Sequence, residues 1–143
     1  MNTLYDQDFY LWTQQTASAL REGRLSEIDI ENTAEEIESL GNSDRDKLES
    51  HLRLVAMHLL KWQAQPDLRG KSWIFTIRVH RRDTGRLMKK SPSLRSKLEE
   101  ALAEAYPDAR QDAALETGIP EESFPDSCPW TIEQILNREF YPE

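Results

Sequence analysis

The chain has 143 residues, of which 38% are hydrophobic and 31% are charged, and its net charge is −8. This length is typical of one domain, and the four Trp, four Tyr and four Phe argue against disorder. The uncharged runs are too short to cross a bilayer, and the N-terminus lacks the pattern of a signal peptide. We therefore expect one soluble, cytosolic domain, residues 1–143, with no membrane partner.

The charges are segregated along the chain. Residues 51–97 carry 12 basic and 2 acidic side chains, whereas residues 1–50 and 98–143 each carry 12 acidic side chains, against 4 and 2 basic ones. Like charges that crowd together repel one another unless opposite charges face them. The basic middle therefore predicts either pairing with the acidic flanks or a surface for an acidic partner.

Apolar residues recur every three or four positions, which favours helices throughout. The first helix is expected to begin at Asp6 as N-cap and to end at Gly23. The second starts at Ser26 or Asp29. Its apolar stripe continues in phase toward Trp62, which favours one long helix, either straight or kinked at residues 41–43, although two helices over residues 29–62 remain open. The stripe consists of Ile30, Ala34, Ile37, Leu40, Leu48, Leu52, Val55 and Leu59.

Residues 65–67, Gln-Pro-Asp, are expected to end this helix, because the residue before proline is pushed out of the helical region. Ser72 should then cap a basic helix over residues 73–90. These elements predict an all-α, single-domain bundle of five to six helices with no β-sheet. We expect the acidic helix 29–40, the long helix and the basic helix to form its centre.

The C-terminal third has several proline signals. Residues 91–92, Ser-Pro, mark a helix start, and Pro107 predicts a kink or break in that helix. Residues 118–130 form a Pro-containing loop. Thr131 and Gln134 form a capping box that begins a short C-terminal helix.

Cys128 is the only cysteine, so the chain has no intrachain disulfide and no multi-cysteine zinc site. We interpret Cys128 as a small buried residue rather than a reactive thiol. His51 and His58 are two helical turns apart, about 10 Å, so one ion cannot bind both. The sequence therefore predicts no metal and no cofactor. A site built from His58, His80 and Glu35 or Glu38 stays open as a minor alternative, but a hydrogen bond from His58 to a carboxylate of the acidic helix is favoured.

The basic helix has polar residues on its core-facing side, where His80 and Arg81 interrupt the apolar pattern. An unpaired buried cation is costly, so a carboxylate of the acidic helix is expected to meet Arg81. The candidate buried polar cluster comprises Glu35, Glu36, Glu38, His58, His80 and Arg81.

Two tryptophans flank the proline turn, with basic residues between them. They form either an aromatic and basic platform for single-stranded nucleic acid or, as we favour, a pair that packs across the turn. The candidate surface for a protein partner or nucleic acid comprises Lys61, Trp62, Arg69, Lys71, Trp73, Arg82, Arg86, Lys89 and Lys90.

Motifs along nearly the whole chain resemble, in order and spacing, the bacterial, largely cyanobacterial, "domain of unknown function 29" family. They are Tyr5-Asp6-x-Asp8-Phe9-x-x-Trp12, Glu35-Glu36-Ile37-x-x-Leu40-Gly41, His58-Leu-Leu-Lys-Trp62, Gln65-Pro66-x-x-Arg69-x-x-Ser72-Trp73-x-x-Thr76-Ile77, Ser91-Pro-Ser-Leu94, Tyr106, Glu116-Thr-Gly118 and Phe124-Pro-x-x-Cys128-Pro129. The resemblance implies an all-helical domain and transfers no activity or catalytic residue.

The leading functional hypothesis is a non-enzymatic interaction or regulatory module that binds a protein partner or itself. A nucleic-acid-binding protein that uses the basic segment 61–97 is the first alternative, and the net charge of −8 argues against a general binder. A metal-dependent hydrolase or nuclease, with Glu35, His58 and Arg81 in its cluster, is the second. No residue is assigned a catalytic role.

Overall fold

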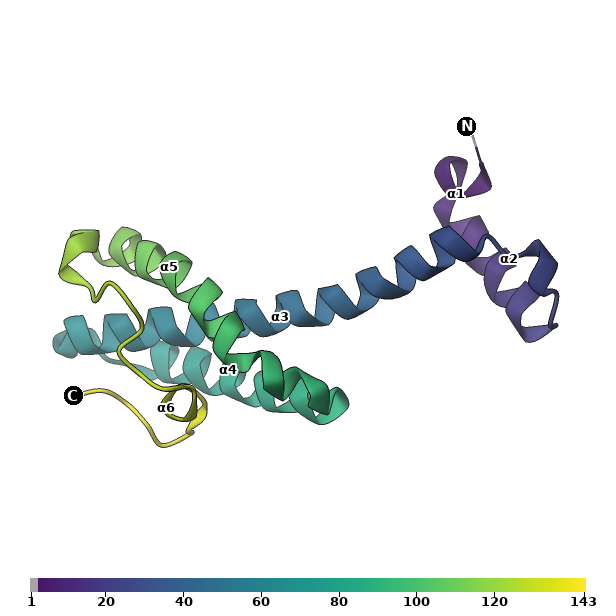
Figure 1. Cartoon of the computed structure of the whole chain (residues 1–143). Coiled ribbons are helices and arrows are strands. Elements are labelled where there is room, and N and C mark those ends of the chain that lie inside the picture. The colour runs from purple at the N-terminus through teal and green to yellow at the C-terminus, as the bar shows by residue number, and fades with distance from the viewer. Residues whose placement is uncertain (1–2) are drawn as a thin grey trace. The chain divides into compact units, whose positions relative to one another are not determined.

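The computed structural model describes residues 3–143. These residues contain six α-helices and four short 3-10 helices, and none of them lies in a strand (Figure 1). The α-helices are α1 (Leu4–Gln7), α2 (Phe9–Arg21), α3 (Ile30–Ala64), α4 (Lys71–Lys90), α5 (Leu98–Thr117) and α6 (Ile132–Leu136). The 3-10 helices are Leu25–Glu27, Pro66–Leu68, Pro92–Lys97 and Glu121–Ser123. The all-α prediction with five to six helices is confirmed.

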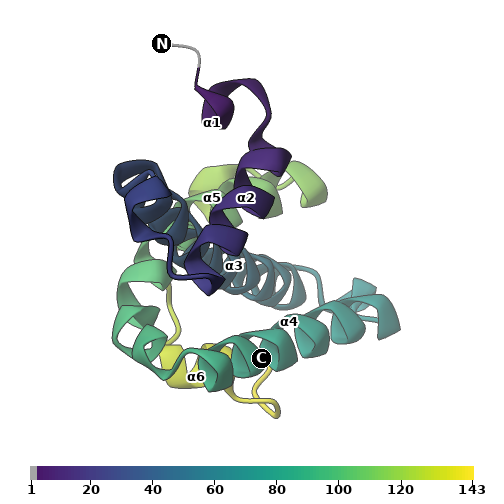
Figure 2. The ribbon, with the colours of Figure 1, turned by 90° about the vertical axis from the view of Figure 1, so that its right-hand side faces the viewer.

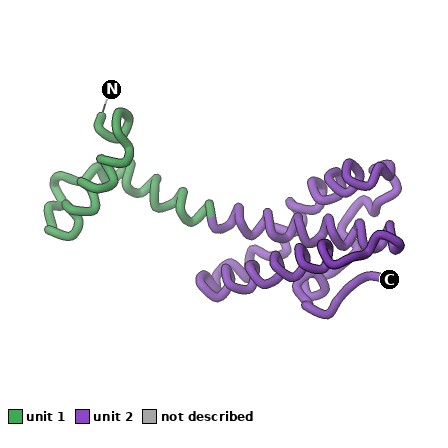
Figure 3. Tube along the Cα trace, turned by 180° about the vertical axis from the view of Figure 1, so that it is seen from behind, with its two compact units in different colours: residues 1–43 green, residues 44–143 purple. Residues whose placement is uncertain are grey.

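The chain divides into two compact units, residues 1–43 and residues 44–143 (Figure 3). The first unit contains α1, α2 and the beginning of α3, and the second contains the rest of α3 with α4, α5 and α6. Each unit is therefore described by itself.

The first unit has a small aromatic centre. Trp12 is buried beneath Tyr5 and Phe9, with ring centroids 4.8 and 5.7 Å away. The Tyr5 hydroxyl donates a hydrogen bond to Glu36, which ties α1 to α3 and raises the pKa of Tyr5 to about 12. Trp12 and Ala19 are the buried apolar residues among the described residues of this unit.

The second unit has a continuous core. The α3 residues Leu48, Leu52, Val55 and Leu59 are each 0% exposed, and they belong to one apolar cluster with residues of α4, α5 and α6. Arg53 of α3 forms an ion pair with Asp112 of α5 at 2.7 Å. Burial of several large apolar side chains is the main source of stability in a unit of this size.

The predicted ends of the long helix are confirmed. Asp29 accepts a hydrogen bond from the backbone of Asn32 at 3.2 Å, as an N-cap does, and α3 stops at Ala64 before Pro66. The helix is continuous through Gly41. Gly23 and Gly118 end α2 and α5 with positive φ angles of 72° and 76°, which glycine adopts readily.

Three cap predictions have different outcomes. Asp8, not Asp6, caps α2, because its side chain accepts from the backbone of Leu11. The prediction that Ser72 caps the basic helix is wrong, since α4 begins at Lys71, two residues before the predicted start, and Gly70 is its N-cap. The predicted capping box of Thr131 and Gln134 is confirmed at the start of α6.

Two further expectations need correction. α5 runs unbroken from Leu98 to Thr117 with Pro107 inside, so the predicted split is wrong. The interpretation that helix 29–40 lies at the centre of a bundle is also wrong, because its stripe residues Ile30, Ile37 and Leu40 are 74%, 64% and 72% exposed. Helical periodicity identified the apolar face but not whether another element covers it.

Every helix in residues 3–143 is too short or too polar to span a lipid bilayer.

Candidate functional site

The two faces of α4 separate its charges. Ile77, Arg81, Thr84 and Met88 recur at spacings of four, three and four residues and are buried. The opposite face exposes basic side chains, as expected for an amphipathic helix. They are Lys71, Arg78, Arg82, Arg86 and Lys89. The prediction that Arg81 lies on the buried side of this helix is confirmed.

The guanidinium of Arg81 binds backbone carbonyls, so the predicted ion pair with the acidic helix is wrong. Its Nε donates to the carbonyl of Ile135 at 2.7 Å, and its Nη2 donates to the carbonyls of Phe140 and Gln134 at 2.9 and 3.3 Å. Arg81 is 4% exposed, and burial lowers the pKa of its guanidinium below the usual range. These three bonds hold the C-terminal segment against α4.

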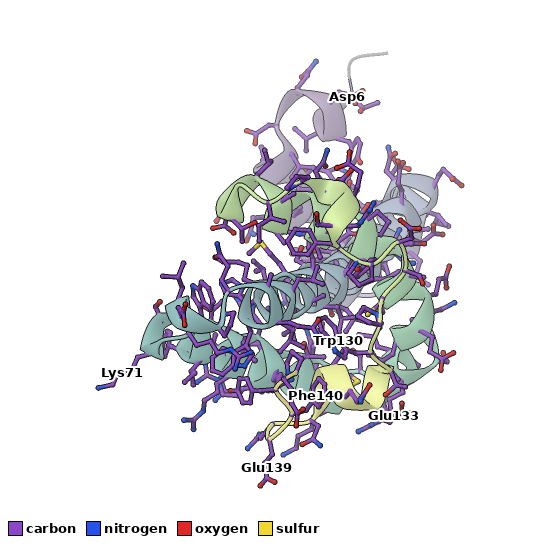
Figure 4. All side chains as sticks on the ribbon, turned by 90° about the vertical axis from the view of Figure 1, so that its left-hand side faces the viewer. Asp6, Lys71, Trp130, Glu133, Glu139 and Phe140 are labelled. Atoms are coloured by element: carbon purple, nitrogen blue, oxygen red, sulfur yellow. The ribbon has the colours of Figure 1, made fainter. Side chains whose placement is uncertain are left out.

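Figures 1 and 2 both show α6 and the C-terminal residues beside α4. The Tyr141 ring extends this contact, since the Arg81 guanidinium carbon lies 5.4 Å from its centroid. In Figure 4, Lys71 extends away from the beginning of α4, and Glu139 points outward from the C-terminal segment. The inner face of α4 is thus structural, and its outer face remains exposed.

A pocket of about 580 Å³ lies along this outer face and reaches the C-terminal segment. Its lining combines five cationic side chains with three apolar ones and includes no acid. The lining residues are Lys71, Ile74, Phe75, Arg78, Val79, Arg81, Arg82 and Arg138. We name this group the α4 pocket. It can attract an anion and also accept apolar surface.

Two observations indicate that the α4 pocket is not already satisfied by the chain. Arg81 Nη1 is buried and has no hydrogen-bond partner among the described residues. Phe75 is 69% exposed, although a large apolar side chain is usually covered. The unpaired Arg81 donor leaves positive charge uncompensated beside the pocket, and apolar ligand surface can cover Phe75.

Trp62 and Trp73, the two tryptophans that flank the proline turn, both contact side chains of the same chain. The Trp62 ring packs against Tyr141 with centroids 4.8 Å apart, and Arg69 lies over Trp62 at 5.0 Å. The Lys61 ammonium lies 4.8 Å from the centroid of Trp73. The interpretation that the two tryptophans pack on each other is therefore wrong, and neither forms a free stacking platform.

Lys61 is itself a correction to the predicted partner surface. It is 8% exposed, and its ammonium lies 3.6 Å from a carboxylate oxygen of Glu116 on α5. The exposed cations of α4 differ in their distances to neighbouring carboxylates. Lys90 is paired with Asp44 at 3.3 Å, and Arg82 and Arg86 lie 3.3 and 3.9 Å from Asp83.

The histidines are arranged differently from the sequence-based hypotheses. His58 Nδ1 is hydrogen-bonded to the carbonyl of Leu54 at 2.8 Å, so the predicted carboxylate partner is wrong. His51 of α3 and His80 of α4 form a pair with their Nδ1 atoms 2.9 Å apart. Burial lowers the pKa of all three histidines, and in His80 the neighbouring His51 contributes further.

The candidate buried polar cluster draws its residues from both units. Glu35 and Glu38 are exposed, Glu36 is half-buried against Tyr5, and all three belong to the first unit. His58, His80 and Arg81 belong to the second unit. Among residues 3–143, no group of three or more His, Cys, Asp or Glu side chains is placed to hold a metal ion.

Cys128 is half-buried and donates to the carbonyl of Trp130 at 3.4 Å. Burial raises the pKa of its thiol, which disfavours the reactive thiolate. It contributes to a second pocket, of about 430 Å³, between α5 and residues 126–133, which lead into the first turn of α6. The Tyr106 hydroxyl donates to the Pro125 carbonyl at 2.7 Å, and burial raises its pKa to about 12. This region fixes the position of the C-terminal segment.

The fold and the α4 pocket define a helical protein with a cationic, partly apolar pocket on the exposed side of α4. The family model described as "Domain of unknown function DUF29" matches residues 4–141, so the chain belongs to this family. A search of curated proteins finds no match, and a search of solved structures finds none either.

Proposed function

We propose that the chain is a non-enzymatic interaction module whose α4 pocket binds an acidic segment of a protein partner. The observation that carries the proposal is the lining of the pocket, with five cations, three apolar residues and no acid. Arg81 and Arg138 contribute from beside the C-terminal segment, while Lys71, Arg78 and Arg82 contribute from the exposed face of α4.

The lining also indicates the chemistry of the partner segment. Arginine guanidinium groups bind carboxylates with two parallel hydrogen bonds, which favours Asp or Glu side chains in the ligand. Ile74, Phe75 and Val79 favour an apolar or aromatic side chain next to those acids. The proposed ligand is therefore a short segment that combines acidic and apolar residues.

The test is a binding titration of the full chain with a fluorescent synthetic peptide of about ten residues that contains Glu and Leu. The double variant Arg78→Glu/Arg82→Glu should weaken binding at least about tenfold, which corresponds to roughly 1.4 kcal/mol. The control is Arg95→Glu/Lys97→Glu, which makes the same charge change at exposed cations outside the pocket.

Equal losses in the two double variants would reject the α4 pocket as the site and indicate a general electrostatic attraction. Binding that persists after Gln replaces every Glu in the peptide would also reject the proposal. The proposal predicts the reverse, namely binding that requires both the peptide carboxylates and the pocket arginines.

Nucleic-acid binding is the second candidate, since exposed cations extend along α4 from Lys71 to Lys89, a length of roughly 27 Å. The occupied tryptophans and the net charge of −8 count against it. An oligothymidine titration distinguishes it, because such binding falls steeply with salt and fails after Arg86→Glu/Lys89→Glu. No group of metal-ligating side chains among residues 3–143 supports the hydrolase alternative.

A further inference from the structure

The first unit exposes an unusual amount of apolar surface. Eight of the eleven exposed large hydrophobic residues in the described part of the chain lie in residues 3–43, against two buried ones. The exposed set is Phe9, Tyr10, Leu11, Leu20, Leu25, Ile30, Ile37 and Leu40. Apolar surface concentrated in this way marks an interaction site more often than an unused surface.

The part of this surface on α3 is regular. Ile30, Ala34, Ile37 and Gly41 recur at spacings of four, three and four residues, which places them on one side of the helix. We call these four residues the α3 stripe. Isoleucine side chains alternate with small residues in it, a pattern that lets a second helix pack closely between them.

In the first unit, α3 turns a polar side toward its neighbours and leaves the α3 stripe exposed. The half-buried positions of α3 here are polar, namely Asn32, Thr33 and Glu36, whereas Ile30 and Ile37 are 74% and 64% exposed. The apolar side of the helix is therefore not the side that its own unit uses. Its own unit leaves this apolar side of the helix uncovered.

Gly41 supports the same conclusion independently. It lies inside α3 without a positive φ, and a Cβ added there would meet no atom within 4 Å. Glycine is disfavoured inside helices compared with alanine. Nothing within the chain requires a glycine at this position, whereas a helix that crosses the stripe closely does.

Charge decides between the possible occupants. Residues 1–43 contain nine acidic and two basic side chains, and one of the basic ones, Arg24, is paired with Glu22 and Glu27 at 2.6 and 2.8 Å. Glu31, Glu35 and Glu38 are exposed on the same helix as the stripe. The same face of a second copy and an anionic membrane are both repelled by these charges.

We infer that the α3 stripe is the docking face for a basic amphipathic helix of a partner protein. The apolar side of that helix packs on Ile30 and Ile37 and approaches the backbone at Ala34 and Gly41. Its flanking Lys or Arg residues face the exposed glutamates of α3. This surface does not include the α4 pocket, so the inference does not rest on the proposed function.

The experiment uses the full chain and a labelled synthetic helix of about 20 residues, with a Leu stripe flanked by Lys, followed by fluorescence anisotropy. A matched peptide carries Glu in place of every Lys. We expect the Lys peptide to bind at least about tenfold more tightly than the Glu peptide.

The variant Ile30→Ser/Ile37→Ser leaves the charge unchanged and should weaken binding of the Lys peptide about tenfold. Gly41→Leu should weaken it as well, because the side chain occupies the point of close approach without meeting any atom of its own chain. The control Leu115→Ser, at a residue 78% exposed in the second unit, should change binding less than about twofold.

Binding that the Ile30→Ser/Ile37→Ser variant leaves unchanged would overturn the inference, because attraction would then be by charge alone. Failure of the Lys peptide to bind would also overturn it. Sedimentation of the chain alone measures its oligomeric state and so distinguishes a separate partner from a second copy. A monomer supports a separate partner, whereas a dimer that the double variant abolishes would identify a second copy as the occupant and overturn the assignment.

Discussion

The two parts of α3 present the same helical stripe in opposite environments. Leu48, Leu52 and Val55 in the second unit are 0% exposed, whereas Ile30 and Ile37 in the first are 74% and 64% exposed. The spacing of the apolar residues continues in phase from one part to the other. The difference shows that periodicity defines which side of a helix is apolar, while only the neighbouring elements determine whether that side is buried.

The largest expected effect is the difference in stability loss between a buried and an exposed position on the apolar side of α3. Leu52→Ala should lower the free energy of unfolding by about 3 kcal/mol, because it leaves a cavity in the core of the second unit. Ile37→Ala should change it by less than about 0.5 kcal/mol. Urea unfolding measures both, and similar losses would contradict the difference in environment.

A second comparison tests the two faces of α4. Arg81→Met should lower the free energy of unfolding by about 2 kcal/mol, because three backbone carbonyls lose their donor. Arg86→Met should change it by less than about 0.5 kcal/mol, since Arg86 is exposed and its contact with Asp83 is long. Equal thermal shifts in the two variants would remove the distinction between inner and outer cations.

The histidines predict a smaller effect, which is confined to the second unit and depends on pH. Because burial lowers the pKa of His51, His58 and His80, the unfolded chain binds more protons than the folded one in mildly acidic solution. Stability should be fully present above the unfolded histidine pKa, about 6.5, and should fall as the pH drops below it.

The substitutions His51→Gln and His80→Gln should each reduce this acid-induced loss of stability. The measurement is the urea midpoint of unfolding at two pH values about 2 units apart, roughly pH 7.5 and pH 5.5. An unchanged pH dependence in both variants would show that the pair at 2.9 Å does not contribute to it.

The smallest expected effect concerns Gly41. Gly41→Ala should raise stability by about 0.5 to 1 kcal/mol, since alanine favours the helix and the added Cβ meets no atom. Gly118→Ala is the matched control and should lower stability, because its φ of 76° strains any residue with a Cβ. Loss of stability in Gly41→Ala would mean that the glycine is needed within the chain.

Local signals in the sequence were sufficient for much of the fold. The Asp29 cap, Pro66, Gly118 and the capping box of Thr131 each act over a few residues, so their consequences are visible in the chain itself. Of the kink or break predicted at Pro107, the break is wrong, because α5 continues through the proline. α5 accommodates it, with buried alanines on both sides of it at positions 105 and 109.

The candidate site was less predictable because its contacts join distant parts of the chain. The amphipathic pattern of α4 separated Arg81 from the outer cations, but the carbonyls of Gln134, Ile135 and Phe140 carry no side-chain signal. The spacing of Lys71, Phe75, Arg78 and Arg82 on one helical face could have revealed most of the α4 pocket. Nothing local indicated Arg138 or the pairing of His51 with His80.

The reactivity of single cysteines on the apolar side of α3 tests most directly whether this side is exposed in the first unit and buried in the second. In a Cys128→Ser background, Ile37→Cys and Val55→Cys place a thiol at an exposed and a buried position of the same helix. Ile37→Cys should be labelled rapidly by a water-soluble maleimide in the dilute chain, whereas Val55→Cys should stay protected until the chain unfolds. Equal protection of both thiols would contradict this difference in exposure.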